Sequence, residues 1–174
     1  DLIDEQAVEV IESASAPGTT YPGLLWVDTA SADNVGEALV ITAVTATLSL
    51  SSTTYTKILW TEVIDTNSAF ASSTFTVPSD GIYRIKASVL FGVATERTGD
   101  EIFDLIIYVD DVAVKFGRRE GTEQYYGYTT VDALLELEEG QTVDIYGYQN
   151  SGTTMSIYVS SLWGGLDIHQ IRNA

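Results

Sequence analysis

Few side chains in this sequence are of the kinds that carry out catalysis. It contains one histidine, His169, and no cysteine, which excludes disulfides and zinc-thiolate sites. A Ser-His-Asp triad would have to use His169, which follows an apolar segment, and the sequence has no Gly-x-Ser-x-Gly elbow. Carboxylates are plentiful, but nothing singles out two of them as the pair of a glycosidase. We therefore predict no enzymatic activity, no cofactor and no metal.

The acidic residues after residue 93 are the one group that suggests a cation. Glu96, Asp100, Glu101 and Asp104 fall in or beside a polar segment that we interpret as a loop. Calcium prefers several carboxylate oxygens at such a place. Solvated loop charges explain the same residues more simply, and the sequence leaves calcium binding open.

A second polar segment, from Arg118 to Tyr128, is the best candidate for a recognition surface. We interpret it as a loop. Its planar arginine donors suit the carboxylates of a glycan, and its aromatic rings suit stacking on sugar rings. The alternative is an ordinary loop whose tyrosines cover a neighbouring subunit. The candidate ligand-binding residues are Arg118, Arg119, Tyr125, Tyr126 and Tyr128.

The chain as a whole is strongly acidic. Its 174 residues include 25 acidic and 8 basic side chains, which gives a formal net charge of -17. Such a charge repels nucleic acid and anionic membranes, and a solvated surface accounts for it. No apolar run reaches the roughly 18 residues of a membrane span, and no signal peptide is recognisable. We expect a soluble protein without nucleic-acid or membrane-inserting partners.

The elements that position these residues are predicted to be strands. The segment from Phe70 to Phe91 alternates apolar and polar residues on both sides of a turn made by Pro78, Ser79, Asp80 and Gly81. Further strands are predicted at 21–29, within 39–64, and at 103–109, 112–116, 129–137, 142–148 and 154–162. Turns fall at 51–54, 110–111, 138–140 and 150–152. Short strands at this spacing are typical of a β-sandwich or jelly roll.

The N-terminal segment differs from the remainder. Residues 1–14 have acidic side chains at the start and apolar ones spaced by four, three and four, which predicts a helix. It serves either as a docking or linker helix or as the foot of a three-stranded coiled coil. Residues 1–44 form this helix, a linker and a docking strand, and 45–174 form the head domain. The chain starts with Asp1, so we expect a processed terminus or a piece of a longer chain.

Phe75, Pro78, Gly81 and Tyr83 have a specific spacing. It resembles that of the jelly roll shared by tumour necrosis factor and the globular heads of complement-type proteins, and the resemblance covers residues 45–171. The segments LWTEVIDTN at 59–67 and SIYVSSLWGGLDI at 156–168 resemble the family's lead and closing strands, and Leu137 to Gln141 resembles its Leu-x-x-Gly-acidic turn. Gln141 replaces the usual acid, which puts any cation or polar contact at that turn in doubt. The resemblance implies an all-β jelly-roll sandwich of two antiparallel sheets.

The N-terminal sequence APGTTYPGLLWVDTAS resembles a short element of bacteriophage tail and fibre proteins. Both families form trimers, so the resemblances imply a homotrimer. The candidate interface residues are Tyr146, Tyr148 and Tyr158, which alternate with the core-facing Val143, Ile145, Ile157 and Val159. Tyrosine is also common on exposed strand surfaces, which is the alternative interpretation.

We predict the head of a trimeric virion surface protein, a fibre or spike, that attaches non-covalently to a host surface glycan or protein. Its N-terminal segment would bind other virion proteins. The alternative is a trimeric decoration protein that stabilises the capsid. A secreted signalling or lectin-like head has less support, and hydrolysis has least. The sequence does not identify the host or the receptor.

Overall fold

The computed structural model describes residues 10–13, 25–28, 39–43, 48–92, 101–121, 127–158 and 164–173. All the secondary-structure elements in these ranges are β-strands, as expected for the all-β class. The chain divides into two compact units, Asp1–Val35 and Gly36–Ala174. We call the second unit the head.

The first unit contains a pair of short parallel strands, β1 (Val10–Ser13) and β2 (Leu25–Asp28). The predicted helix is therefore wrong over Val10–Ser13, and residues 1–9 lie outside the described part. Val10 and Ile11 are adjacent β-branched residues, which favour an extended backbone over a helix. The strand expected within 21–29 is present as β2.

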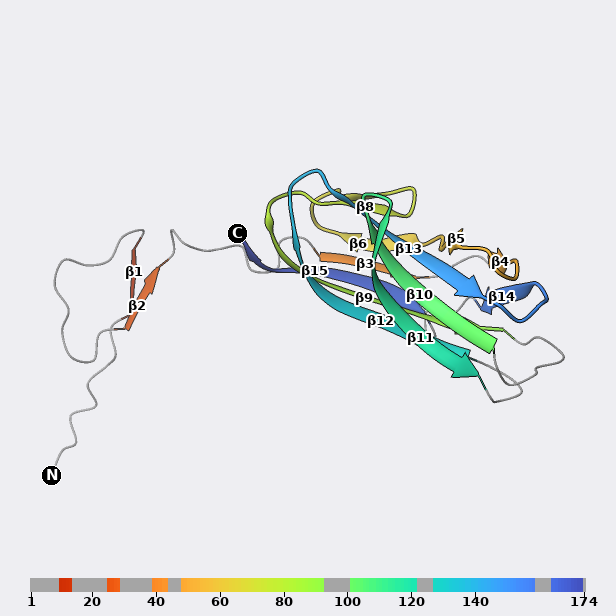
Figure 1. Ribbon diagram of the computed structural model, residues 1–174. Coiled ribbons are helices and arrows are strands. Elements are labelled where there is room, and N and C mark those ends of the chain that lie inside the picture. Colours follow the sequence, from red (N-terminus) through yellow and green to blue (C-terminus); the bar gives the residue numbers. More distant parts are fainter. Residues whose placement is uncertain are drawn as a thin grey trace, which may run out of the picture. The chain divides into compact units, whose positions relative to one another are not determined.

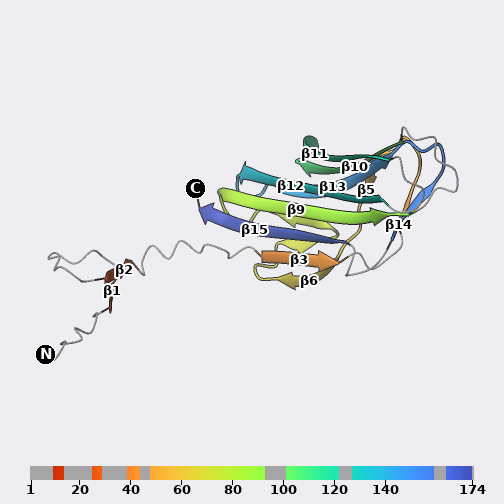
Figure 2. The same ribbon diagram turned by 90° about the horizontal axis from the view of Figure 1, so that it is seen from below.

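The head is a sandwich of two antiparallel sheets, which confirms the predicted jelly-roll fold (Figures 1 and 2). The first sheet contains β11 (Val112–Gly121), β10 (Glu101–Val109), β13 (Thr142–Gln149), β8 (Thr74–Thr76) and β7 (Phe70–Ala71), with β5 (Thr56–Lys57) also paired to β13. The second contains β4 (Leu48–Leu50), β14 (Met155–Tyr158), β9 (Gly81–Phe91), β15 (Gly165–Asn173), β3 (Leu39–Ala43) and β6 (Thr61–Asp65), with β12 (Gly127–Leu137) paired to β9. We call them the six-stranded and the seven-stranded sheet. Figure 2 shows β12, β9, β15, β3 and β6 side by side.

Strand β3 begins before residue 45, which is the predicted start of the head domain. It pairs with β15 from Ala43 opposite Gly165 to Leu39 opposite His169, and with β6 on its other side. The head thus includes a strand that the sequence analysis assigned to the N-terminal segment.

The alternation in β9 follows the predicted pattern. Tyr83, Ile85, Ala87, Val89 and Phe91 are completely buried, whereas the residues between them are partly or fully exposed. The turn at Pro78 to Asp80 then carries the chain from β8 in one sheet to β9 in the other. It is held in place because the Tyr83 hydroxyl donates to the Ser79 carbonyl at 2.7 Å.

Aromatic pairs join the two layers at both ends of β9. Phe75 and Tyr83 lie 5.9 Å apart between ring centroids, and Phe91 and Phe103 lie 5.3 Å apart. Each pair takes one ring from each sheet, and all four side chains are completely buried. These are the largest of the completely buried side chains, so they contribute strongly to holding the layers together.

The two sheets approach each other closely along β11 and β12. A Cβ atom at Gly117 of β11 would overlap the main chain of Thr130 and Val131 in β12. Only a residue without a side chain allows this approach. Gly117 therefore allows β11 and β12 to come together at one side of the sandwich.

Among the described strands, β6 lies at one edge of the seven-stranded sheet. Its Val63 is 62% exposed and its Ile64 is 42% exposed. Glu62 and Asp65 flank these two residues directly. The outer strand is thus apolar at its centre and acidic on either side.

Candidate binding surfaces

The outward side of the six-stranded sheet carries a group of aromatic side chains, Tyr55, Tyr108, Phe116, Tyr146 and Tyr148, which we call the aromatic face. The strand registers place Ile106 of β10 between Phe116 of β11 and Tyr146 of β13. Ile106 points away from the core between the sheets and is nevertheless completely buried. The rings therefore cover the sheet without help from another molecule.

Two pairs of rings lie in contact on this face. Tyr55 and Tyr148 have centroids 4.8 Å apart, and Tyr108 and Tyr146 have centroids 4.5 Å apart. Burial raises the pKa of Tyr108, and its interactions with Tyr55 and Tyr146 raise it further. Three phenol groups from different strands or loops thus lie close to one another.

Arg118 lies at the end of the aromatic face and not in a loop. It is a residue of β11 opposite Asp104 of β10, and its Nε and Nη2 donate to the two Asp104 carboxylate oxygens at 2.9 Å each. Hydrogen bonding to Asp104 raises the pKa of Arg118. The Asp104 side chain is 2% exposed and that of Arg118 is 50% exposed. A buried carboxylate therefore fixes a half-exposed guanidinium.

This position also corrects the interpretation of the acidic segment. Glu101 and Asp104 are buried residues of β10, so they are not loop carboxylates open to a cation. Glu96 and Asp100 lie outside the described residues. Within the described ranges, no group of three or more potential metal ligands comes together.

The other residues of the predicted recognition loop do not gather around Arg118. Arg119 is the next residue of β11 and therefore lies on the opposite side of the strand, while Tyr128 belongs to β12 in the seven-stranded sheet. Tyr125 and Tyr126 lie outside the described residues. Both ends of the predicted loop are strand, because β11 continues to Gly121 and β12 begins at Gly127.

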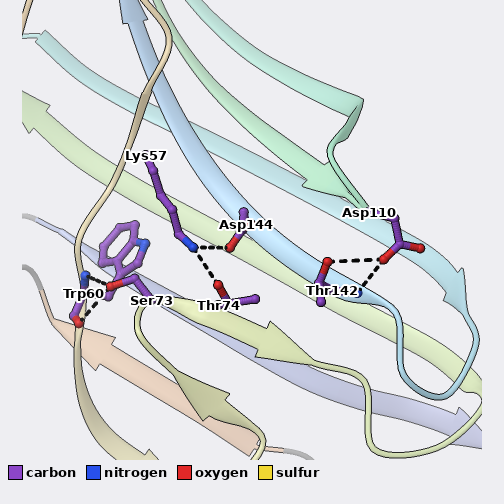
Figure 3. A network of polar contacts seen from close by, with 7 residues as sticks. All are labelled: Lys57, Trp60, Ser73, Thr74, Asp110, Thr142 and Asp144. Carbon is purple, nitrogen blue, oxygen red and sulfur yellow. Dashed lines mark hydrogen bonds and ion pairs between the residues drawn. The ribbon is translucent and has the colours of Figure 1, made fainter.

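A polar network adjoins the aromatic face on β5, β8 and β13 (Figure 3). The ammonium group of Lys57 lies 2.7 Å from an Asp144 carboxylate oxygen and donates to the Thr74 hydroxyl at 2.6 Å. Both charged side chains are mostly buried, with 27% of Lys57 and 14% of Asp144 exposed. The network ties the short strands β5 and β8 to β13.

The outward side of the seven-stranded sheet has a different character. Tyr128 of β12 and Tyr158 of β14 both lie opposite Leu90 of β9, and Leu134 lies further along β12. Leu134 is 64% exposed, Tyr128 49% and Tyr158 43%. We call these four residues the Leu134 face. Leu134 is more exposed than any ring of the aromatic face, where Tyr55 is 51% and Phe116 is 50% exposed.

The three tyrosines predicted for the subunit interface thus do not all lie on the same sheet. Tyr146 and Tyr148 are on the aromatic face, whereas Tyr158 is on the Leu134 face. The alternation is as predicted, since Val143, Ile145 and Ile157 are buried. Val159 lies outside the described residues.

Charged residues lie within the Leu134 face, where Asp132 and Lys86 stand opposite each other between Leu134 and Tyr128. Arg84 donates from Nη2 to an Asp132 carboxylate oxygen at 2.7 Å, and this hydrogen bond lowers the pKa of Asp132. Lys86, Asp167 and His169 border a shallow hollow next to Arg84. His169 therefore sits among charged groups of the sheet surface.

Gln141 preserves the turn at which the sequence departs from the family pattern. Its side chain accepts the Glu138 N–H at 2.9 Å and donates to an Asp110 carboxylate oxygen at 3.0 Å. Gly140 has a φ of 87°, which glycine adopts at little cost. Asp110 also accepts the N–H of Thr142 at 2.8 Å (Figure 3). The turn is thus held by hydrogen bonds with no need for a cation.

Acid is expected to weaken this turn. The Thr142 N–H and the Gln141 amide lower the pKa of Asp110 below its ordinary value of 3.8. The stabilisation from this carboxylate is therefore complete above about pH 4 and is lost as the pH falls through the lower folded-state value. We expect Asp110→Asn to reduce the fall in melting temperature between neutral pH and pH 3, measured by circular dichroism. Asp111→Asn, at the next position, is the control and should retain the wild-type pH dependence.

The described part of the chain contains no helix with the length and hydropathy of a membrane span. Neither a protein-family model nor a curated protein sequence matches the chain.

Solved structures do resemble it. Murine APRIL at pH 5.0 superimposes with a TM-score of 0.60 at 14% identity, covering 76% of this chain and 98% of that one. Eiger TNF from S. frugiperda gives a TM-score of 0.59 at 10% identity, with 80% and 95% covered. The globular domain of zebrafish complement 1qA gives 0.54 at 12% identity, with 79% and 99% covered. The head therefore has the jelly-roll fold of tumour necrosis factor and complement 1q, as its sequence suggested.

Proposed function

We propose that the head is a non-enzymatic binding domain that works as a homotrimer on the surface of a virion and attaches it to a host cell. The observation that carries this proposal is the Leu134 face, where large apolar side chains stand exposed on a rigid sheet. Exposed apolar groups in one area mark a surface that another molecule covers. The resemblance to trimeric jelly-roll families suggests that this molecule is a second and third copy of the chain.

The two faces of the sandwich then have different binding roles. The Leu134 face, with Tyr158 and Tyr128, contacts the neighbouring subunits. The aromatic face, with Tyr146, Tyr148 and Arg118, stays open for the receptor because its rings already cover the sheet beneath them. The sequence predicts Tyr128 to bind the receptor, and we now propose it for the subunit interface. Tyr146 and Tyr148 are predicted for the interface, and we now propose them for the receptor surface.

Leu134→Glu is expected to dissociate the trimer. In the interface the new carboxylate would lose water, and Arg84 opposite it is already paired with Asp132, so we expect the dissociation constant to rise more than about a hundredfold. Sedimentation equilibrium at micromolar concentration measures this change, and circular dichroism checks the fold. Val112→Glu is the matched control, because Val112 is 63% exposed on the six-stranded sheet and should remain trimeric. A wild-type chain that sediments as a monomer would contradict the proposal.

The virion location rests on the phage-like segment at residues 16–31. A second candidate function, capsid decoration, is favoured by the separate N-terminal unit, which offers a means of docking on a shell. The number of copies per particle distinguishes the two functions. A stained gel of purified virions should show far fewer copies than capsid subunits for an attachment protein, and a similar number for a decoration protein.

A further inference from the structure

The aromatic face has the features of a preformed ligand platform. Tyr148 supports one side of Tyr55, and the Tyr55 side chain is still 51% exposed. The β-strands fix Tyr108, Tyr146 and Tyr148, which are only partly exposed. Binding a ligand on this surface would require little ordering of side chains, which is a main cost of association.

Polar groups lie near Tyr55 on the outward side of the sheet. Arg118 of β11 and Tyr148 of β13 lie on either side of Asp104 in β10, and Tyr55 stacks on Tyr148. A guanidinium group has five N–H donors, and the pair with Asp104 uses only its Nε and one Nη2 hydrogen. The remaining donors belong to a group whose position a buried carboxylate fixes. The platform thus presents N–H donors and phenol groups that both donate and accept.

The charge of this region decides between ligand classes. Arg118 is neutralised by Asp104 and Lys57 by Asp144, and Glu120, two residues from Arg118 on β11, adds a negative charge, so the platform carries no excess positive charge. The chain as a whole has a net charge of -17, which disfavours an acidic ligand. A flat ligand with apolar C–H groups on one side and hydroxyls at its edge fits an aromatic surface bordered by such donors and acceptors.

We propose that the aromatic face binds an uncharged saccharide, with a pyranose ring stacked on Tyr55 and hydroxyl groups bonded to Arg118 and Tyr108. Tyr148 is a positioning residue that supports Tyr55. The proposal rests on the proposed function in host attachment and names the ligand class of that surface. It places the sugar site on strands of the six-stranded sheet and not in the segment between β11 and β12.

The test uses the full-length chain on an array of neutral oligosaccharides together with sialylated and uronic-acid oligosaccharides. We expect binding to neutral members only, and calorimetry with the best of them should give an affinity that is insensitive to sodium chloride. Tyr55→Ala should weaken this affinity about tenfold or more, and Tyr55→Phe, which keeps the ring, should weaken it less. Val112→Ala should bind as the wild type does.

Several outcomes would overturn the saccharide site. The first is binding only to acidic oligosaccharides, with the binding lost at high salt. The second is an unchanged saccharide affinity in the Tyr55→Ala variant. The third is attachment to host cells that survives periodate oxidation of their glycans but not protease treatment, which would indicate a protein receptor. In each case a trimer that still adsorbs to host cells leaves the proposed function intact. Neutral-sugar binding by a chain that does not adsorb to cells would instead refute the attachment function alone.

Discussion

Replacing Phe91 by alanine is expected to lower the free energy of unfolding of the head by about 3 to 5 kcal/mol. Phe91 of β9 is completely buried against Phe103 of β10, so its removal leaves a cavity between the two layers. The rigid strands on both sides limit how far the cavity can collapse. Urea denaturation followed by tryptophan fluorescence measures the change, which should appear as a lower midpoint with an unchanged slope.

Phe116→Ala is the matched control for this experiment. Phe116 is 50% exposed on the outward side of the same sandwich, and its loss should change stability by less than about 1 kcal/mol. Equal effects of the two substitutions would contradict the layered core. A tenfold difference in the unfolding constant corresponds to about 1.4 kcal/mol, so the two results are easily separated.

The second large effect is expected at Gly117. A methyl group there would overlap main-chain atoms of β12, and β12 cannot move aside without breaking its hydrogen bonds to β9. We expect Gly117→Ala to destabilise the head by about 3 kcal/mol, at the upper end of typical overpacking costs.

Gly147→Ala provides the comparison for Gly117→Ala. A Cβ at Gly147 would meet the ends of the Leu50 and Ile58 side chains, at 2.7 and 3.0 Å. Side-chain ends shift more easily than a strand backbone, so about 1 kcal/mol is expected. If Gly147→Ala proved the more damaging in the same urea experiment, the close approach of β11 and β12 would not be the feature that requires glycine.

The strands of the head were predictable because each one carries its own signal. The alternation in β9 and the Asp110-Asp111 turn depend on neighbours in sequence. Both aspartates of that turn have positive φ, at 48° and 63°, as a two-residue hairpin requires. The same local signals misled at Val10–Ser13, where the apolar spacing fitted a helix but the observed partner is a second strand.

The candidate site was harder to predict because it depends on register between strands. Arg118 and Glu101 were assigned to loops from their polar surroundings. Only the pairing of β10 with β11 shows that Arg118 lies beside Asp104, which is 14 positions away. Alternation likewise identified the outward side of each strand, but it did not reveal that Tyr158 and Tyr146 belong to different sheets.

The outer strand β6 bears on whether heads at high concentration associate edge to edge. An apolar strand at the margin of a sheet readily recruits a like strand from another molecule, and fibrils grow in this way. Glu62 and Asp65 on either side of Val63 and Ile64 act against such growth, since two β6 strands brought together would set carboxylates against carboxylates. We therefore expect concentrated heads to resist polymerisation through this edge.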